Sequence, residues 1–266
     1  MTTTNAHIGM LDGAPLSVAR IGLRAKTAAL TTTNGKVNLS TALIEVGDLL
    51  SIKSTSGAVL GWAGELQPDK ADTLDKLVIE TTNGAPGFFS LPHPALRLVS
   101  LTLSTGPSSA GIKGQWAAKE VKAKTTNGVI AASFSSVVRG LSLQTTNERL
   151  TASVELGQKP IDIVPISTKT TNGALELEIL PAKGKVAALK IEASTSNQPL
   201  TVVAPDFAGS FELATSNAGV EVTGERVHVG DKGGSHARGD RHALSGGNGK
   251  GQLIARTANA RLKVAF

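Results

Sequence analysis

The sequence contains no cysteine and no tyrosine, and aromatic residues make up only 3% of the chain. The absence of cysteine excludes disulfide bonds, thiol catalysis and cysteine-ligated zinc. Hydrophobic residues still account for 40% of the 266 positions, which is enough for a continuous core. With so few aromatic side chains, we expect that core to be thin and filled by Leu, Ile, Val and Ala.

Long apolar runs are absent as well. No run in the sequence approaches the roughly 20 residues that a membrane-spanning helix requires. The stretch Met1–Ile8 lacks the basic and apolar regions of a secretory leader. The sequence alone therefore predicts a cytoplasmic location by default.

What the chain does contain is a recurring Thr-Thr-Asn-Gly motif. It is clearest at 32–35, 81–84, 125–128 and 170–173, and weaker copies continue toward the end of the chain. Apolar residues alternate with polar ones on both sides of most of these asparagines, which is typical of half-buried strands. The alternation changes phase at Asn-Gly, so we expect the chain to turn there. The asparagines of this predicted ladder are Asn34, Asn83, Asn127, Asn147, Asn172, Asn197, Asn217 and Asn259.

Two architectures explain such a pattern. One is a meander of hairpins, because Asn-Gly between alternating apolar residues is a strong hairpin signal. The other is a solenoid, in which each asparagine marks a corner and successive coils stack. Glu148 and Pro199 follow two of the asparagines and suit a type I′ hairpin poorly, since one resists positive φ and the other cannot donate to a ladder. Stacking also explains why the motif recurs, because like side chains then share hydrogen bonds.

We therefore predict an all-β fold, a single-stranded β-solenoid (β-helix). With weaker copies included, the motif recurs about every 23 residues, which gives about 11–12 coils. The repeat runs without a linker, so we expect one domain over residues 1–266, with an N-terminal cap and first coil at 1–30. We expect the asparagines to stack at buried corners, and the threonine directly before each of them to point outward.

Positive charge is concentrated near the C-terminal end. Between Glu225 and Phe266 there are eight basic and three acidic residues, and residues 230–251 contain eight glycines. This composition predicts a flexible basic loop inserted between two coils. Such a loop can cradle anions, and the candidate anion-binding residues are Arg238, Arg241 and Lys250. The alternative is a solvated loop that binds nothing.

The last residues of the chain are apolar at alternate positions. We expect Leu262, Val264 and Phe266 to leave that end of the stack comparatively apolar, and self-association end to end or through edge strands is possible.

Catalytic and metal-binding patterns are weak. Glu192 and Glu212 hold the same position before their asparagines, but no third acidic residue joins them as a β-helical carbohydrate-active enzyme would require. His236, Asp240 and His242 could hold a metal only if the loop were rigid. We predict no enzyme activity, no cofactor and no metal, and the sequence contains no specific nucleic-acid-binding motif.

The Thr-Thr-Asn-Gly cores, each following an alternating apolar strand, resemble bacterial adhesin-like and autotransporter-adhesin-head β-solenoid families. They are also similar to a set of uncharacterised fungal proteins that repeat the same motif. The resemblance covers nearly the whole chain. It implies a β-solenoid fold, a role in adhesion and a location at the cell surface.

Two functions follow as expectations. The first is a non-enzymatic structural or adhesin-like repeat scaffold, with the cell surface as its partner. The alternative is a binding module that recognises an anionic polymer or a membrane surface through the basic C-terminal region. Salt separates them, because only the binding module should lose affinity steeply as salt rises.

Overall fold

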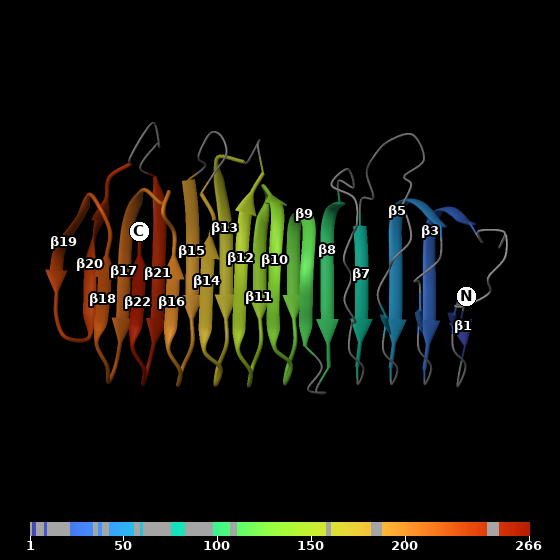
Figure 1. Ribbon diagram of the computed structural model, residues 1–266, viewed down its shortest axis with the longest axis horizontal. Helices are drawn as coiled ribbons and strands as arrows, with labels where there is room; N and C mark the ends of the chain where they lie inside the picture. The colour runs from blue at the N-terminus through green and yellow to red at the C-terminus, as the bar shows by residue number, and fades with distance from the viewer. Residues whose placement is uncertain are drawn as a thin grey trace, which may run out of the picture. The chain divides into compact units, whose positions relative to one another are not determined.

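The computed structural model describes residues 2–3, 8–9, 22–33, 37–38, 43–55, 59–60, 76–82, 98–106, 111–157, 161–181, 188–243 and 250–266. Within these ranges every regular element is a strand (Figure 1). The same ranges contain no helix that is long and apolar enough to span a membrane. The chain divides into two compact units, residues 1–132 and 133–266, which are described in turn. That the whole chain is one domain, with a cap over residues 1–30, stays a prediction.

The first unit is a stack of parallel coils. The strands of one sheet pair in sequence order, and three short strands form a second sheet. Like residues meet in register: Leu50 lies opposite Leu77 and Ile52 opposite Ile79, all buried in the core. The first sheet contains β1 (Thr2–Thr3), β3 (Gly22–Thr32), β5 (Leu43–Ser54), β7 (Lys76–Thr81), β8 (Leu98–Thr105) and β9 (Ile112–Lys124), and the second contains β2 (Ile8–Gly9), β4 (Val37–Asn38) and β6 (Val59–Leu60).

The second unit repeats this arrangement. Strands before the asparagine corners pair with one another in parallel, and so do the strands after them. This all-β stack of coils confirms the predicted β-solenoid. Strand β10 (Ile130–Val137) crosses the division between the units; the strands before the corners are β11 (Gly140–Gln144), β13 (Ile163–Lys169), β15 (Ala188–Ser194), β17 (Gly209–Thr215) and β21 (Gly251–Thr257), and those after them are β12 (Leu150–Leu156), β14 (Leu175–Ile179), β16 (Leu200–Val203), β18 (Val220–Thr223) and β22 (Leu262–Ala265).

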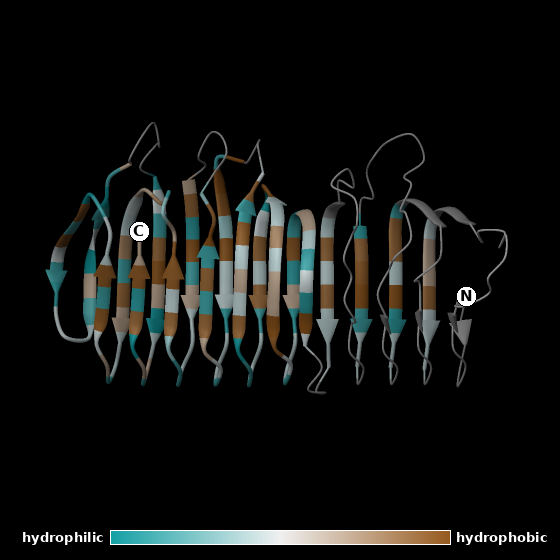
Figure 2. Ribbon diagram, in the orientation of Figure 1, coloured by the Kyte–Doolittle hydropathy of each residue, from teal (hydrophilic) through white to brown (hydrophobic). Residues whose placement is uncertain are grey.

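The core follows the predicted period of two. Along β13 exposed and buried residues alternate without a break, so that Val164 and Ile166 point inward while Pro165 and Ser167 point to solvent. The alternation recurs in neighbouring strands as bands of apolar and polar residues (Figure 2). Because the strands are in register, like inward residues lie above one another, as Leu141, Ile166 and Ile191 do.

The coils of the second unit are not stacked in sequence order. Strand β21 pairs in parallel with β15 on one side and with β17 on the other. After the corner, β22 lies between β16 and β18 in the same way. The last strands of the chain thus stand inside the stack, between strands that precede them (Figure 1). The expectation that Leu262 and Val264 make the far end comparatively apolar is wrong, because both are fully buried.

A hairpin covers the outer edge of β17 in the second unit. Strands β19 (Val227–Lys232) and β20 (His236–Arg241) pair in antiparallel fashion, and β20 also pairs in antiparallel fashion with β17. The predicted flexible loop over 230–251 is therefore structured through residue 241. Charged and glycine-rich strands suit this position, since they keep a sheet edge from pairing with another chain. Residues 244–249 of that predicted loop lie outside the described residues.

Candidate functional site

The predicted asparagine ladder exists in the second unit, on the surface of the stack. The amide nitrogen of Asn172 donates to the side-chain oxygen of Asn147 at 2.8 Å, and Asn197 donates to Asn172 at 2.9 Å. The ladder continues from Asn259 to Asn197 at 2.8 Å and from Asn217 to Asn259 at 2.7 Å. All five side chains are exposed, so the expectation of buried asparagine corners is wrong. The amides stack because each coil repeats the same turn.

The other predicted ladder residues are only partly described. Asn127 is half-buried and belongs to the first unit. Asn34 and Asn83 lie outside the described residues, so their place in the ladder stays a prediction.

The buried polar residues at the corners are threonines and one serine, two positions before each asparagine or the residue that takes its place. Their hydroxyl groups link two coils: Thr170 accepts from the Gly173 backbone nitrogen at 3.2 Å and donates to the Glu148 carbonyl at 3.2 Å. Thr195 donates to the Gly173 carbonyl in the same way at 3.0 Å. These bonds satisfy backbone groups that would otherwise be buried without a partner. The buried row contains Thr32, Ser54, Thr81, Thr105, Thr125, Thr145, Thr170, Thr195, Thr215 and Thr257.

This buried row is not among the residues predicted from the sequence, although the spacing of the apolar residues indicates it. The inward apolar residues stand six and four positions before each asparagine, so the residue two positions before it shares their phase. From the sequence we expect the asparagine at a buried corner, because like side chains that stack there share hydrogen bonds. The turn instead directs the threonine inward and the asparagine outward.

Charged residues on the outer faces are matched between neighbouring coils. Arg149 forms an ion pair with Glu176 of the next coil at 2.6 Å, and in the first unit Lys53 pairs with Glu80 at 2.8 Å. The basic C-terminal segment follows the same rule. Glu221 contacts two of its residues, Arg261 at 2.5 Å and Lys263 at 3.5 Å. Acidic residues outside the segment therefore neutralise part of its charge.

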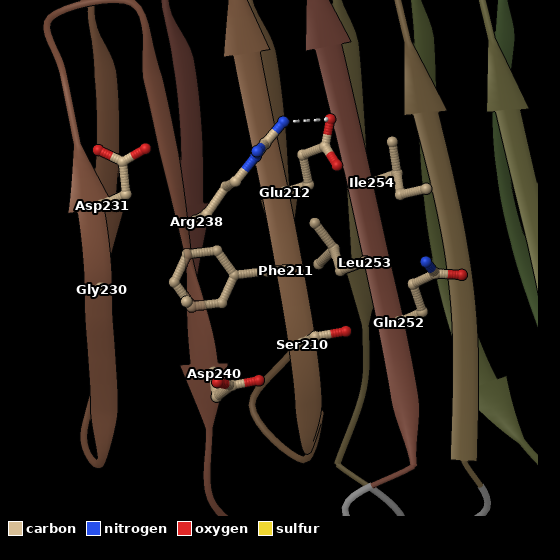
Figure 3. Close-up of a pocket in the computed structure, with 11 residues that line it drawn as sticks. Ser210, Phe211, Glu212, Gly230, Asp231, Arg238, Asp240, Gln252, Leu253 and Ile254 are labelled. Atoms are coloured by element: carbon tan, nitrogen blue, oxygen red, sulfur yellow. Dashed lines mark ion pairs between the residues drawn. The ribbon is translucent and has the colours of Figure 1, made fainter.

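The structure separates the three predicted anion-binding residues. Arg238 lies exposed on the outer face of β20 and forms an ion pair with Glu212 at 3.6 Å (Figure 3). Glu212 also pairs with Arg256 at 3.3 Å. Lys250 is exposed at the start of the last coil, whereas Arg241 is only 3% exposed. Arg241 thus has no guanidinium surface to offer an external anion.

Arg241 instead fastens the hairpin to the end of the stack. Its Nη1 donates to the Phe207 carbonyl at 2.6 Å, and its Nε donates to the Glu225 carbonyl at 3.4 Å. The guanidinium also lies 5.5 Å from the centre of the Phe266 ring. Burial lowers the pKa of Arg241, against the opposing effects of Asp206 and Glu225. An arginine held by backbone carbonyls and a ring has a structural role.

A shallow depression of about 390 Å³ lies on the outer face where β17, β19, β20 and β21 meet (Figure 3). Gly230 and Gly239 leave it room, and the side chains of Glu212, Arg238 and Ile254 line it. The Glu212–Arg238 ion pair joins two of those side chains. The depression presents charges of both signs beside an apolar residue, which suits no single charged ligand.

The predicted metal candidates are not brought together. His236 and Asp240 share the outer face of β20 but stand four residues apart, roughly 13 Å along an extended strand. His236 lies 3.3 Å from Asp231 of the neighbouring strand. In the part of the chain that the structure describes, no three acidic or histidine side chains gather as a metal site.

The aligned acidic pair is also separated. Glu192 and Glu212 are not on adjacent strands, because Ile254 of the inserted β21 stands between them in register. Two strand spacings place their backbones roughly 10 Å apart.

No family model, no curated protein and no solved structure matches this chain. The resemblance to adhesin-like families and to fungal repeat proteins therefore stays a prediction.

Proposed function

We propose that this chain is a non-enzymatic structural scaffold whose repeated polar residues hold a stack of coils together. The observation that carries the proposal is that the side chains of the Thr-Thr-Asn-Gly motif form hydrogen bonds between coils. Its threonines are buried in hydrogen bonds between coils, and its asparagines bond to one another along the corner. A motif used in this way provides rigidity and leaves the outer faces of the strands free to vary.

The matched charges on those faces support the same proposal. Arg149 with Glu176, and Glu221 with Arg261 and Lys263, join one coil to the next. Exposed pairs of this kind each contribute only about 0.2–1 kcal/mol, but they recur along a repeat. An adhesin-like role at a cell surface is the finer form of the proposal, and it rests on the resemblance of the motif.

The alternative is a module that binds an anionic polymer or membrane surface. The excess of basic residues after Glu225 favours it. Two observations weigh against it. Arg241 is buried, and Arg238 and Arg256 both form ion pairs with Glu212. We therefore keep it as the second candidate.

Retention on immobilised heparin at increasing salt tests the two against each other. The double variant Arg238→Ala/Lys250→Ala removes two exposed charges from the C-terminal region. The matched control Lys124→Ala/Lys169→Ala removes two exposed charges elsewhere. The scaffold proposal expects both variants to elute at the same salt concentration. Earlier elution of the C-terminal variant alone would favour the binding module and count against the scaffold.

A further inference from the structure

The last coil of the chain occupies a slot that other coils build. We define the C-terminal coil as residues 250–266, and the slot as the space between β15/β16 and β17/β18. Residues of β21 face partners in both β15 and β17, and those of β22 face partners in both β16 and β18. All of these pairings are parallel, so none of them is made through a tight turn. The coil is held by its two walls and not by its neighbours in sequence.

Charge fits this coil to this slot. The coil carries four basic residues and no acidic one: Lys250, Arg256, Arg261 and Lys263. The strands that form the walls carry three acidic residues and one basic residue: Glu192, Glu212, Glu221 and Lys190.

The charges of the coil and the walls make direct contact. Arg256 lies 3.3 Å from Glu212, and Lys263 lies 3.5 Å from Glu221. A basic segment in an acidic slot favours this occupant over a neutral or acidic coil, because opposite potentials across an interface set specificity.

Shape makes the fit more selective. Leu253, Leu262 and Val264 are completely buried between the walls. At Gly251 a Cβ atom would meet the Ala208 carbonyl oxygen at 2.5 Å and the Phe207 ring at 2.9 Å. The slot therefore takes a coil with glycine at this position, and the C-terminal coil supplies it.

We propose that the slot is a binding site for a basic coil, and that a second copy of this chain can fill it with its own residues 250–266. The contacts in the slot are the same whether the coil comes from the same chain or from another. Exchange of an identical element between copies is a low-cost route to association for this reason. The proposal concerns how copies join, and it does not depend on the scaffold function.

A pair of charge-reversed variants tests the proposal. One variant carries Glu212→Lys/Glu221→Lys, which makes its slot basic while its coil stays basic. The other carries Arg256→Glu/Lys263→Glu, which makes its coil acidic while its slot stays acidic. Each is mismatched within its own chain, but a mutually exchanged pair matches both slots. After the two are unfolded and refolded together, light scattering should find about tenfold more dimer than in either variant alone at equal total concentration. A mixture that contains only the sum of the separate species would overturn the proposal.

Cross-linking tests the same point without charge changes, and it decides the matter if a reversed variant does not fold. Ser210 and Gln252 are exposed and lie opposite each other in register. The native chain has no cysteine to compete. A tagged Ser210→Cys chain refolded with a differently tagged Gln252→Cys chain should form a mixed disulfide. The control replaces Ser210→Cys by Ser142→Cys, which is exposed on another strand. We expect about tenfold more mixed product than in the control, and equal yields would overturn the proposal.

Discussion

At the scale of single residues, the corners depend on threonine and not on asparagine. Thr170 →Val keeps the shape of the side chain but removes bonds to the Gly173 nitrogen and the Glu148 carbonyl. Leaving buried partners unsatisfied costs about 1–3 kcal/mol each, so we expect a clear loss in the free energy of unfolding measured with urea. The control is Thr171→Val in the same turn, where the side chain is half-exposed. Equal losses for the two variants would contradict the inward assignment.

The exposed asparagines should tolerate change better. Asn147→Asp keeps an oxygen that accepts from the Asn172 amide but loses the Asn147 amide nitrogen, and water solvates both side chains. We expect a loss of at most about 0.5–1.5 kcal/mol, the range for one hydrogen bond, and not the larger penalty of a buried charge. Thermal unfolding measures the difference. A loss of several kcal/mol would restore the buried-corner interpretation.

The hydroxyl of Thr168 is buried but does not stabilise the stack. In the part of the chain that the structure describes, the Thr168 hydroxyl is buried and has no hydrogen-bond partner. Its neighbours in register are Leu143 and Ala193, which are both apolar. We expect Thr168→Val to stabilise the protein by about 1 kcal/mol, since it removes the desolvation penalty at nearly constant volume. A urea midpoint below that of the wild type would contradict this.

At the scale of elements, the hairpin β19–β20 depends on one buried arginine. Arg241→Ala removes the bond to the Phe207 carbonyl and the contact with Phe266. We expect a loss of roughly 2–4 kcal/mol, with faster amide exchange concentrated in the hairpin. Arg238→Ala is the control, because it stands on the same strand but points to solvent. If both variants exchange alike, Arg241 does not fasten the hairpin.

The hairpin shows where a sequence pattern fails at this scale. Val227 and Val229 alternate as in a strand, yet the glycines and charges that follow them are equally typical of a loop. An outermost strand buries little apolar surface, so its sequence carries only a weak period. Interior strands such as β13 pair with a strand on each side and bury one face. There the alternation of apolar and polar residues was enough to predict a strand. The burial of the turn threonines could also be predicted from the sequence, because they share the inward phase of the apolar residues.

At the scale of the whole molecule, the order of the coils is what the repeat could not reveal. Gly209 and Gly251 stand at the same position of their coils, as do Phe211 and Leu253. By sequence pattern alone, either β17 or β21 could therefore be the neighbour of β15. The choice depends on the sum of contacts over both walls, and such contacts are not encoded in any short stretch. Alternation predicts strands, but not which strands are neighbours.

Two valines in register test that order. Val264 lies between two strands and is fully buried, whereas Val222 lies opposite it on β18 and is half-exposed. We expect Val264→Asp to cost several kcal/mol and to lower the melting temperature strongly, because it buries a charge. Val222→Asp should cost less. If the coils followed the order of the sequence, Val264 would lie in the outermost coil and the ranking would reverse.

The inserted coil also has a consequence for protein synthesis. As the second unit grows, its coils can stack one after another through β16, since each needs only those already made. The next coil, β17 with β18, cannot take its final place until residues 251–266 have left the ribosome. A premature stop codon after residue 243 would therefore remove an interior layer and not a terminal one. The stack of the second unit is therefore closed only once residues 250–266 have been made.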